Sequence, residues 1–87
     1  MKLFSIRDAK AEAFTRPFFA NTTGEALRSF TSAVNQVDEK NVFFTNTEDF
    51  DLYLCAEFDE RTGKIKSPDT PQHLSKGVEV KKVQNLT

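Results

Sequence analysis

The residues that could carry out nucleophilic or acid–base chemistry are few in this chain of 87 residues. Its one histidine is His73 and its one cysteine is Cys55. A thiol next to a histidine can become a nucleophile, but only where the fold places the two side chains within hydrogen-bond reach. We expect Cys55 within a strand and His73 in a Pro-containing loop, and no motif brings them together. Cys55 then serves as a small, partly buried apolar residue, and His73 as a solvated surface residue.

Carboxylates are numerous in the middle of the chain, but their spacing does not match a metal-binding motif. A calcium loop needs alternating acidic residues followed by a glycine, and this pattern is absent. The glycines Gly24, Gly63 and Gly77 are too scattered to form a phosphate-binding loop. A hydrolase or metal enzyme would require His73 to converge with the carboxylates. We therefore predict a protein with no catalytic residues, metal or cofactor.

Basic and aromatic residues indicate nucleic-acid binding instead, because single-strand binders combine a basic groove with aromatic platforms. Arg16 lies just before Phe18 and Phe19, and Lys64 and Lys66 share one face of a predicted strand. The candidate nucleic-acid-binding residues are Arg16, Phe18, Phe19, Arg28, Lys64 and Lys66. The same Phe side chains could instead belong to the core or to a subunit interface, and the residue types alone favour this second interpretation. No helix-turn-helix, zinc-finger or RNP-like motif is present.

Charge is unevenly distributed along the chain, although the formal net charge is only −1. Residues 38–60 carry eight acidic groups and one basic group, whereas residues 61–87 carry six basic groups and two acidic ones. Such a chain can present a basic face to a polyanion, or it can pair its own charges. The acidic stretch Asp38–Glu60 leaves an alternative open, in which the protein is an adaptor that binds another protein and does not contact nucleic acid.

The clearest predicted element is a helix from Thr22 to Val37. Its apolar residues recur at intervals of three and four, which places them on one face of an α-helix. These residues are Ala26, Leu27, Phe30, Ala33, Val34 and Val37. Thr22 and Glu25 fit a capping box, in which the Thr22 hydroxyl accepts from the Glu25 amide and the Glu25 carboxylate reaches the Thr22 amide. The rest of the chain must cover the apolar face of this helix.

Strands are predicted on either side of the helix in the sequence. Lys2–Arg7 and Asp51–Asp59 both alternate between two faces and end at turn residues. The aliphatic face of the second strand should pack on the helix, and it comprises Leu52, Leu54, Ala56 and Phe58. A hairpin loop from Asp59 to Lys64, in which Gly63 can adopt positive φ, should follow. The strand Lys64–Lys66 then returns with Ile65 facing the core and both lysines facing out.

The remaining segments have weaker patterns. We expect a loop over 8–21 with a short extended piece at Phe18-Phe19, and either a short strand or a segment across the helix end at 42–44. A loop at 67–77, a last strand at 78–83 and a frayed end at 84–87 complete the chain. The result is an α+β fold in a single domain of residues 1–87. One amphipathic helix packs on a small, mainly antiparallel three- to four-stranded sheet.

The size of the chain predicts self-association. A domain this small buries only roughly 60–65% of the surface that its unfolded chain exposes, so a homo-oligomer would complete the core. The N-terminal residues lack the apolar run of a signal peptide, and no window approaches the roughly 18 apolar residues of a membrane span. A single cysteine fits a reducing compartment. We expect an intracellular protein without membrane contact.

The order of several short motifs resembles a known protein family. The motifs are Met1–Asp8, Lys10–Phe14, Arg16–Phe19, Gly24–Phe30, Ala33–Asn35, Glu48–Tyr53, Phe58–Asp59 and Thr62–Gly63. In this succession they resemble the small nonstructural protein of gokushovirus-type microviruses, which are single-stranded DNA bacteriophages.

The resemblance implies a non-virion protein that acts in the infected cell, either by binding DNA or by controlling the synthesis of viral single-stranded DNA. We therefore expect a protein of the host cytoplasm that binds single-stranded DNA and acts in replication or packaging of the viral genome. The resemblance provides no catalytic residues and no established DNA contacts. The adaptor alternative would then dock on the viral replication initiator or on a host replication protein.

Overall fold

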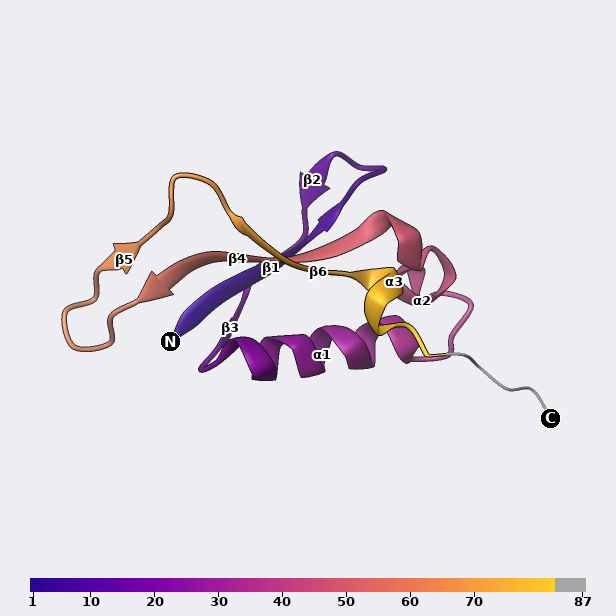
Figure 1. Cartoon of the computed structure of the whole chain (residues 1–87), viewed down its shortest axis with the longest axis horizontal. Helices are drawn as coiled ribbons and strands as arrows, with labels where there is room; N and C mark the ends of the chain where they lie inside the picture. The colour runs from indigo at the N-terminus through magenta and orange to yellow at the C-terminus, as the bar shows by residue number, and fades with distance from the viewer. Residues whose placement is uncertain (83–87) are drawn as a thin grey trace.

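The computed structural model describes residues 1–82 and has a sheet with one long helix beside it (Figure 1). Its elements in chain order are β1 (Lys2–Asp8), β2 (Ala13–Phe14), β3 (Phe18–Ala20), α1 (Thr23–Asn35), α2 (Val42–Thr45), the 3-10 turn η1 (Thr47–Asp49), β4 (Phe50–Phe58), β5 (Ile65–Lys66), β6 (Gln72–Lys76) and α3 (Gly77–Val80). None of these helices is long and apolar enough to cross a membrane.

The sheet is built around the antiparallel pair β1 and β4. The short strands β2 and β3 share the outer edge of β1, while β5 and β6 share the outer edge of β4. The predicted α+β class and the antiparallel pairing are confirmed. The predicted number of three to four strands is wrong, because each edge carries two short strands and the described sheet has six.

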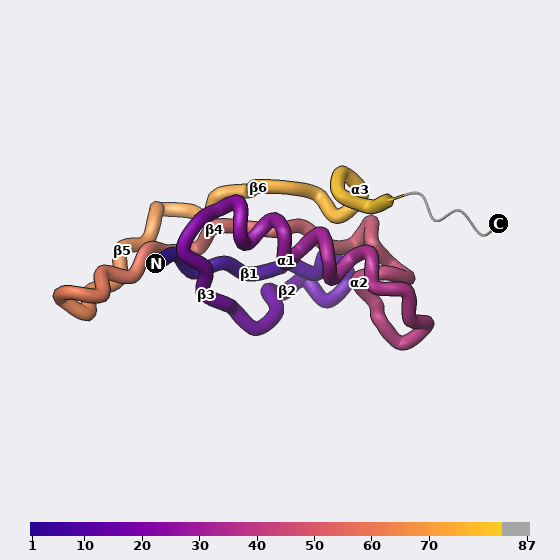
Figure 2. Tube along the Cα trace, turned by 90° about the horizontal axis from the view of Figure 1, so that it is seen from below, coloured from indigo at the N-terminus to yellow at the C-terminus, as the bar shows by residue number. Residues whose placement is uncertain are grey.

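Helix α1 covers one face of the sheet (Figure 2). Thr22 caps it as predicted, since its Oγ1 accepts from the Glu25 amide at 3.1 Å. The Glu25 carboxylate accepts from the amide of Asn21 at 3.3 Å, one residue before the amide that the sequence suggests. The helix ends at Asn35, so Val37 lies beyond it and is 67% exposed.

The core forms between α1 and the central strands. The helix contributes the buried residues Ala26, Phe30 and Val34, in agreement with the predicted apolar face. The sheet contributes Phe4 and Ile6 from β1 and Phe50 and Leu52 from β4. The two elements that the sequence marks most clearly therefore pack on each other and on β1.

A bulge in β4 changes which side chains face the helix. Phe4 pairs with Leu54, whereas the preceding Leu3 pairs with Ala56, so Cys55 is the extra residue. Paired residues share a face, and an extra residue shifts the alternation by one position. The structure thus confirms the predicted core face for Leu52 and Leu54 but moves Ala56 and Phe58 to the opposite face. Ala56 is buried there, outside the main core.

The segment after β4 differs most from the sequence-based prediction. The predicted loop at 67–77 contains β6, and the predicted strand at 78–83 begins as the single turn α3. Ile65, predicted to face the core, is 61% exposed because β5 pairs only with the last residues of β4, beyond α1. Val83 and the predicted frayed end at 84–87 lie outside the described residues.

The remaining short segments agree in part with the sequence-based prediction. Phe18-Phe19 is extended, as predicted, and forms most of β3, but β2 also lies in the segment expected to be a loop. Residues 42–44 form a helical turn rather than a strand, capped by the Asn41 side chain, which accepts from the Phe43 amide at 3.2 Å. Gly63 has φ +75°, as the predicted hairpin requires.

Candidate nucleic-acid interface

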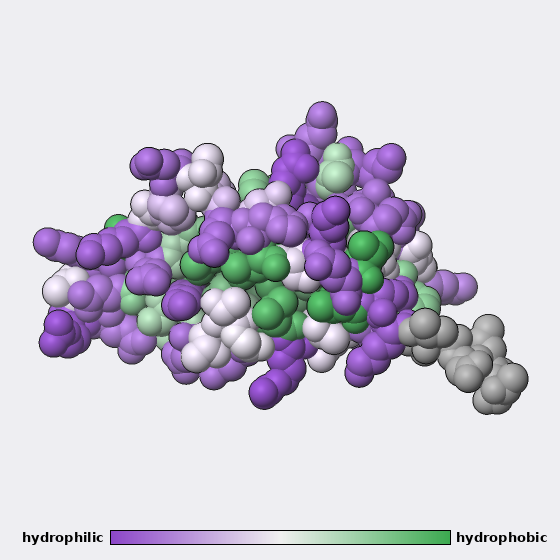
Figure 3. Space-filling view, viewed as in Figure 1, coloured by the Kyte–Doolittle hydropathy of each residue, from purple (hydrophilic) through white to green (hydrophobic). Residues whose placement is uncertain are grey.

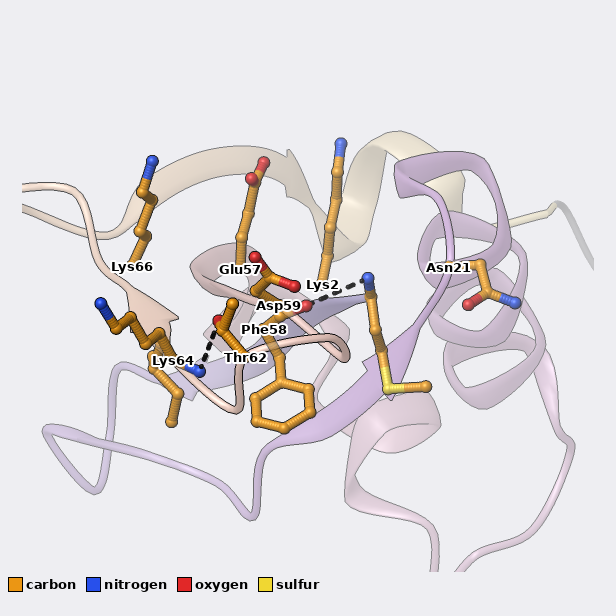
Figure 4. A pocket seen from close by; sticks show the side chains of 10 residues that line it. Lys2, Asn21, Glu57, Phe58, Asp59, Thr62, Lys64 and Lys66 are labelled. Atoms are coloured by element: carbon orange, nitrogen blue, oxygen red, sulfur yellow. Dashed lines mark hydrogen bonds between the residues drawn. The ribbon is translucent and has the colours of Figure 1, made fainter.

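Three lysines line one hollow at the end of the sheet, which we call the lysine hollow (Figure 4). Its volume is about 590 Å³. The structure brings the predicted pair Lys64 and Lys66 together there and adds Lys2 from β1. The carboxylates Glu57 and Asp59 also line it, so the side chains of the hollow have an excess of positive charge.

Strand pairing creates this cluster. Lys2 pairs with Glu57, and Glu57 pairs with Lys66, so the three side chains form a row across β1, β4 and β5. Figure 4 shows these side chains extending in the same direction, whereas the Phe58 ring points the other way. Glu57 thus lies between two lysines in the strand register, an arrangement of opposite charges that is favourable across neighbouring strands. The sequence-based candidate set did not include Lys2, because only the register of β1 against β4 places it beside Lys66.

The hairpin between β4 and β5 positions Lys64. Asp59 accepts from the Arg61 amide through Oδ1 at 2.9 Å, and its carbonyl accepts from the Gly63 amide at 2.7 Å. Thr62 Oγ1 accepts from the Lys64 amide at 3.3 Å. Positive φ at Gly63 lets the chain turn back without the strain that a β-carbon would cause.

The two predicted phenylalanines have different surroundings. The Phe18 ring packs against the core and stacks on Phe4 at 5.8 Å between ring centroids. Phe19 is 54% exposed and contacts Phe58 edge-on at 6.1 Å, on the face to which the bulge turns Phe58. Of the pair, Phe19 therefore has a ring surface available to a ligand, whereas Phe18 contributes mainly to packing.

The two predicted arginines lie on other elements. Arg16 is exposed in the segment between β2 and β3, and Arg28 is exposed on α1. The structure therefore groups Lys64 and Lys66 in one site and places Arg16 and Arg28 outside the residues that line it.

The face of β1 and β4 away from α1 carries a second group of side chains, and we call this face the open face. Tyr53 lies at its centre, with the Phe14 ring at 5.2 Å and the His73 ring at 5.3 Å between centroids. His73 Nε2 and Asp51 Oδ2 are 2.7 Å apart. The sequence-based candidate set missed these residues. The alternation of this strand, which turns Tyr53 away from Leu52 and Leu54, is the sequence feature that could have identified Tyr53 as part of this group.

The cysteine and the histidine considered for catalysis have different surroundings. Cys55 lies at the bulge, and burial raises the pKa of its thiol, which disfavours the nucleophilic thiolate at neutral pH. His73 contacts Asp51 and Tyr53. Within residues 1–82, no group of three or more His, Cys, Asp or Glu side chains is placed to hold a metal ion.

The acidic stretch Asp38–Glu60 does not form one surface. Asp38 lies in the loop after α1, near one end of the nine-residue strand β4, and Asp59 and Glu60 follow its other end. Glu57 lies between lysines, and Asp51 contacts His73 on the open face. The carboxylates of this stretch thus lie towards both ends of β4.

The fold and the lysine hollow describe a small α+β protein with a basic surface at one end of its sheet. A family model described as Phage ORF5 protein matches residues 1–80, and the chain belongs to this family. It is therefore a small phage protein, and the resemblance to a phage family found in the sequence is confirmed. Searches of curated proteins and of solved structures gave no match.

Proposed function

We propose that this phage protein binds single-stranded DNA without catalysing a reaction and acts in replication or packaging of the viral genome in the host cytoplasm. The observation that carries the proposal is the convergence of Lys2, Lys64 and Lys66 on one hollow. Phosphate oxygens are the natural partners of exposed ammonium groups, and their contacts supply most of the sequence-independent affinity for a nucleic acid. Membership in a phage family is consistent with a partner of this kind.

The position of the lysine hollow also favours an extended ligand. The hairpin that carries Lys64 and Lys66 extends beyond the end of α1 (Figure 1). A flexible polyanion can approach these lysines without displacing a structural element.

A homo-oligomer belongs to the same proposal, since Phe19, Ile65 and Val78 are large apolar residues that remain more than half exposed. Such residues are what a second copy of the chain would cover.

Charge reversal tests the proposal. In the double variant Lys64→Glu, Lys66→Glu, the affinity for a labelled single-stranded oligonucleotide should fall by at least about tenfold at low salt, because two phosphate contacts become repulsive. The fold should persist, since both side chains are exposed. Fluorescence anisotropy measures the affinity, and circular dichroism checks the fold.

The matched control is the double variant Lys40→Glu, Lys82→Glu, which makes the same change in net charge. Both residues are exposed in segments next to the C-terminal half of α1, at the opposite end of the sheet. The control should lose much less affinity than the hairpin variant. Equal losses in both variants would show that only net charge matters, and an unchanged hairpin variant would remove the lysine hollow from the proposed site.

A further inference from the structure

The open face of the sheet lacks the cover that α1 gives to the other face. In Figure 1, α1 lies below the central strands, and β2 projects to the opposite side. Strand pairing defines two adjacent rows of side chains on this open face. The first row is Phe14, Arg7, Asp51 and Lys76, and the second is Ser5, Tyr53 and His73. Along β1 and β4 the rows are two residues apart, or about 7 Å, whereas a register shift in the pairing of β4 with β6 places Lys76 and His73 three residues apart.

The aromatic residues of these rows form one connected group. The Phe14 and Tyr53 rings meet edge to face at an interplanar angle of 73°, and the Tyr53 and His73 rings meet at 84°. An edge-to-face contact sets the edge of one ring against the face of another. Tyr53 itself is half-buried between its two neighbours. Phe14 is 44% exposed and His73 is also exposed, so the group is accessible from solvent. Ser5, beside Tyr53, is small and buried, and its hydroxyl donates to the Thr15 carbonyl at 2.7 Å.

The charges around the aromatic group favour a polyanion. Asp51 pairs with Arg7 on one side and Lys76 on the other, and its carboxylate also contacts His73. The one carboxylate in these two rows therefore lies between two cationic residues in the strand register and next to the His73 ring. Aromatic rings with adjacent cations are what a single-stranded nucleic acid requires, because its bases stack and its phosphates need positive charge nearby.

We infer that the open face, centred on Tyr53, is the surface on which unpaired bases of single-stranded DNA stack. The inference rests on the proposed function and deepens it by assigning the bases to a surface distinct from the lysine hollow. Phosphates next to the stacked bases lie within reach of Arg7 and Lys76. A base stacked on Tyr53 contributes affinity with little sequence preference, since every base has an aromatic face.

Tyr53 is the one tyrosine in a chain without tryptophan, so intrinsic tyrosine fluorescence reports on this residue alone. Titration with an unlabelled thymidine oligonucleotide should reduce the emission at least about twofold at saturation, because stacking quenches the phenol ring. Free tyrosine amide in the same titration corrects for absorption by the DNA. An abasic strand of equal length, which offers phosphates but no bases, should leave the emission nearly unchanged.

A substitution series provides the affinity measurement. Tyr53→Leu should weaken binding of a labelled oligonucleotide by roughly fivefold to a hundredfold, the range of one base–aromatic stacking contact. Tyr53→Phe keeps the ring and should bind as the wild type does. Phe14→Leu provides a second test at an exposed edge position, where loss of fold is a smaller risk, and should also weaken binding.

The fluorescence and affinity measurements distinguish a failure of this inference from a failure of the proposed function. If the labelled oligonucleotide binds the wild type while Tyr53 emission stays constant and Phe14→Leu binds normally, the open face is not the stacking surface and the proposed function stands. If the oligonucleotide does not bind even at low salt, both fail. If the Lys64→Glu, Lys66→Glu variant binds weakly but shows the full loss of emission at saturation, the bases lie on the open face as inferred.

Discussion

Lys2 and Lys66 are separated by most of the chain, and strand register places them on either side of Glu57. At the scale of residues, the candidate interface therefore depends on pairing that no local pattern reveals. Lys64 and Lys66 were identifiable from the sequence because they alternate within one short segment. Phe18 and Phe19, adjacent in the sequence, point to different surroundings because neighbouring strand residues face opposite sides.

Gly77 packs so closely against the backbone of Thr47 and Phe50 that a larger residue does not fit there. A β-carbon at this position would lie 2.6 Å from the Thr47 carbonyl oxygen and 2.9 Å from the Phe50 carbonyl oxygen. Both contacts are to backbone, which cannot move aside as a side chain can. Gly77→Ala should therefore lower the free energy of unfolding by about 1–3 kcal/mol, measured by urea denaturation.

The matched control is Gly24→Ala in the first turn of α1. Its added β-carbon would have an ordinary contact, 3.8 Å to Thr22 Oγ1. This variant should be stabilised by roughly 0.4–1 kcal/mol, because alanine restricts the unfolded chain and favours the helix. A Gly77→Ala variant as stable as the wild type would mean that α3 does not pack against η1 as described.

At the scale of elements, α1 and β4 were predictable because each buries one face, and a buried face leaves a periodic pattern in the sequence. The strand β6 was not predictable. Its sequence is mostly polar, and it exists because its backbone pairs with the free edge of β4. The bulge at Cys55 was equally invisible, since the alternation of Leu52 to Phe58 continues in the sequence where the backbone shifts.

The side-chain cap of Thr22 on α1 should contribute measurably to the stability of the fold. Thr22→Ala removes the hydroxyl that accepts from the Glu25 amide and should lower the free energy of unfolding by about 1 kcal/mol. Ser29→Ala, at an exposed position in the middle of the same helix, serves as the control and should be neutral or slightly stabilising. Equal urea midpoints for Thr22→Ala and the wild type would contradict the described cap.

At the scale of the whole molecule, the fold distributes a nearly neutral charge unevenly. The described structure is elongated, with extents of 52 × 25 × 20 Å, and the β4–β5 hairpin with its lysines lies at one end. Figure 3 shows a largely hydrophilic surface on the face of that view, with apolar side chains gathered in a band between the sheet and α1. The lysine hollow and the open face lie on different sides of the sheet, so variants can test them separately.

Single-stranded DNA binding is tested most directly by titrating a labelled single-stranded oligonucleotide with the unmodified protein and measuring its fluorescence anisotropy at salt concentrations from low to moderate. Binding at low salt is expected. For the three lysines of the hollow alone, the logarithm of the association constant should fall with the logarithm of salt concentration with a slope near −2 on a single strand, and phosphate contacts of Arg7 and Lys76 on the open face would steepen the slope to about −3.5. Absence of binding at low salt would contradict the proposed function and favour a protein partner.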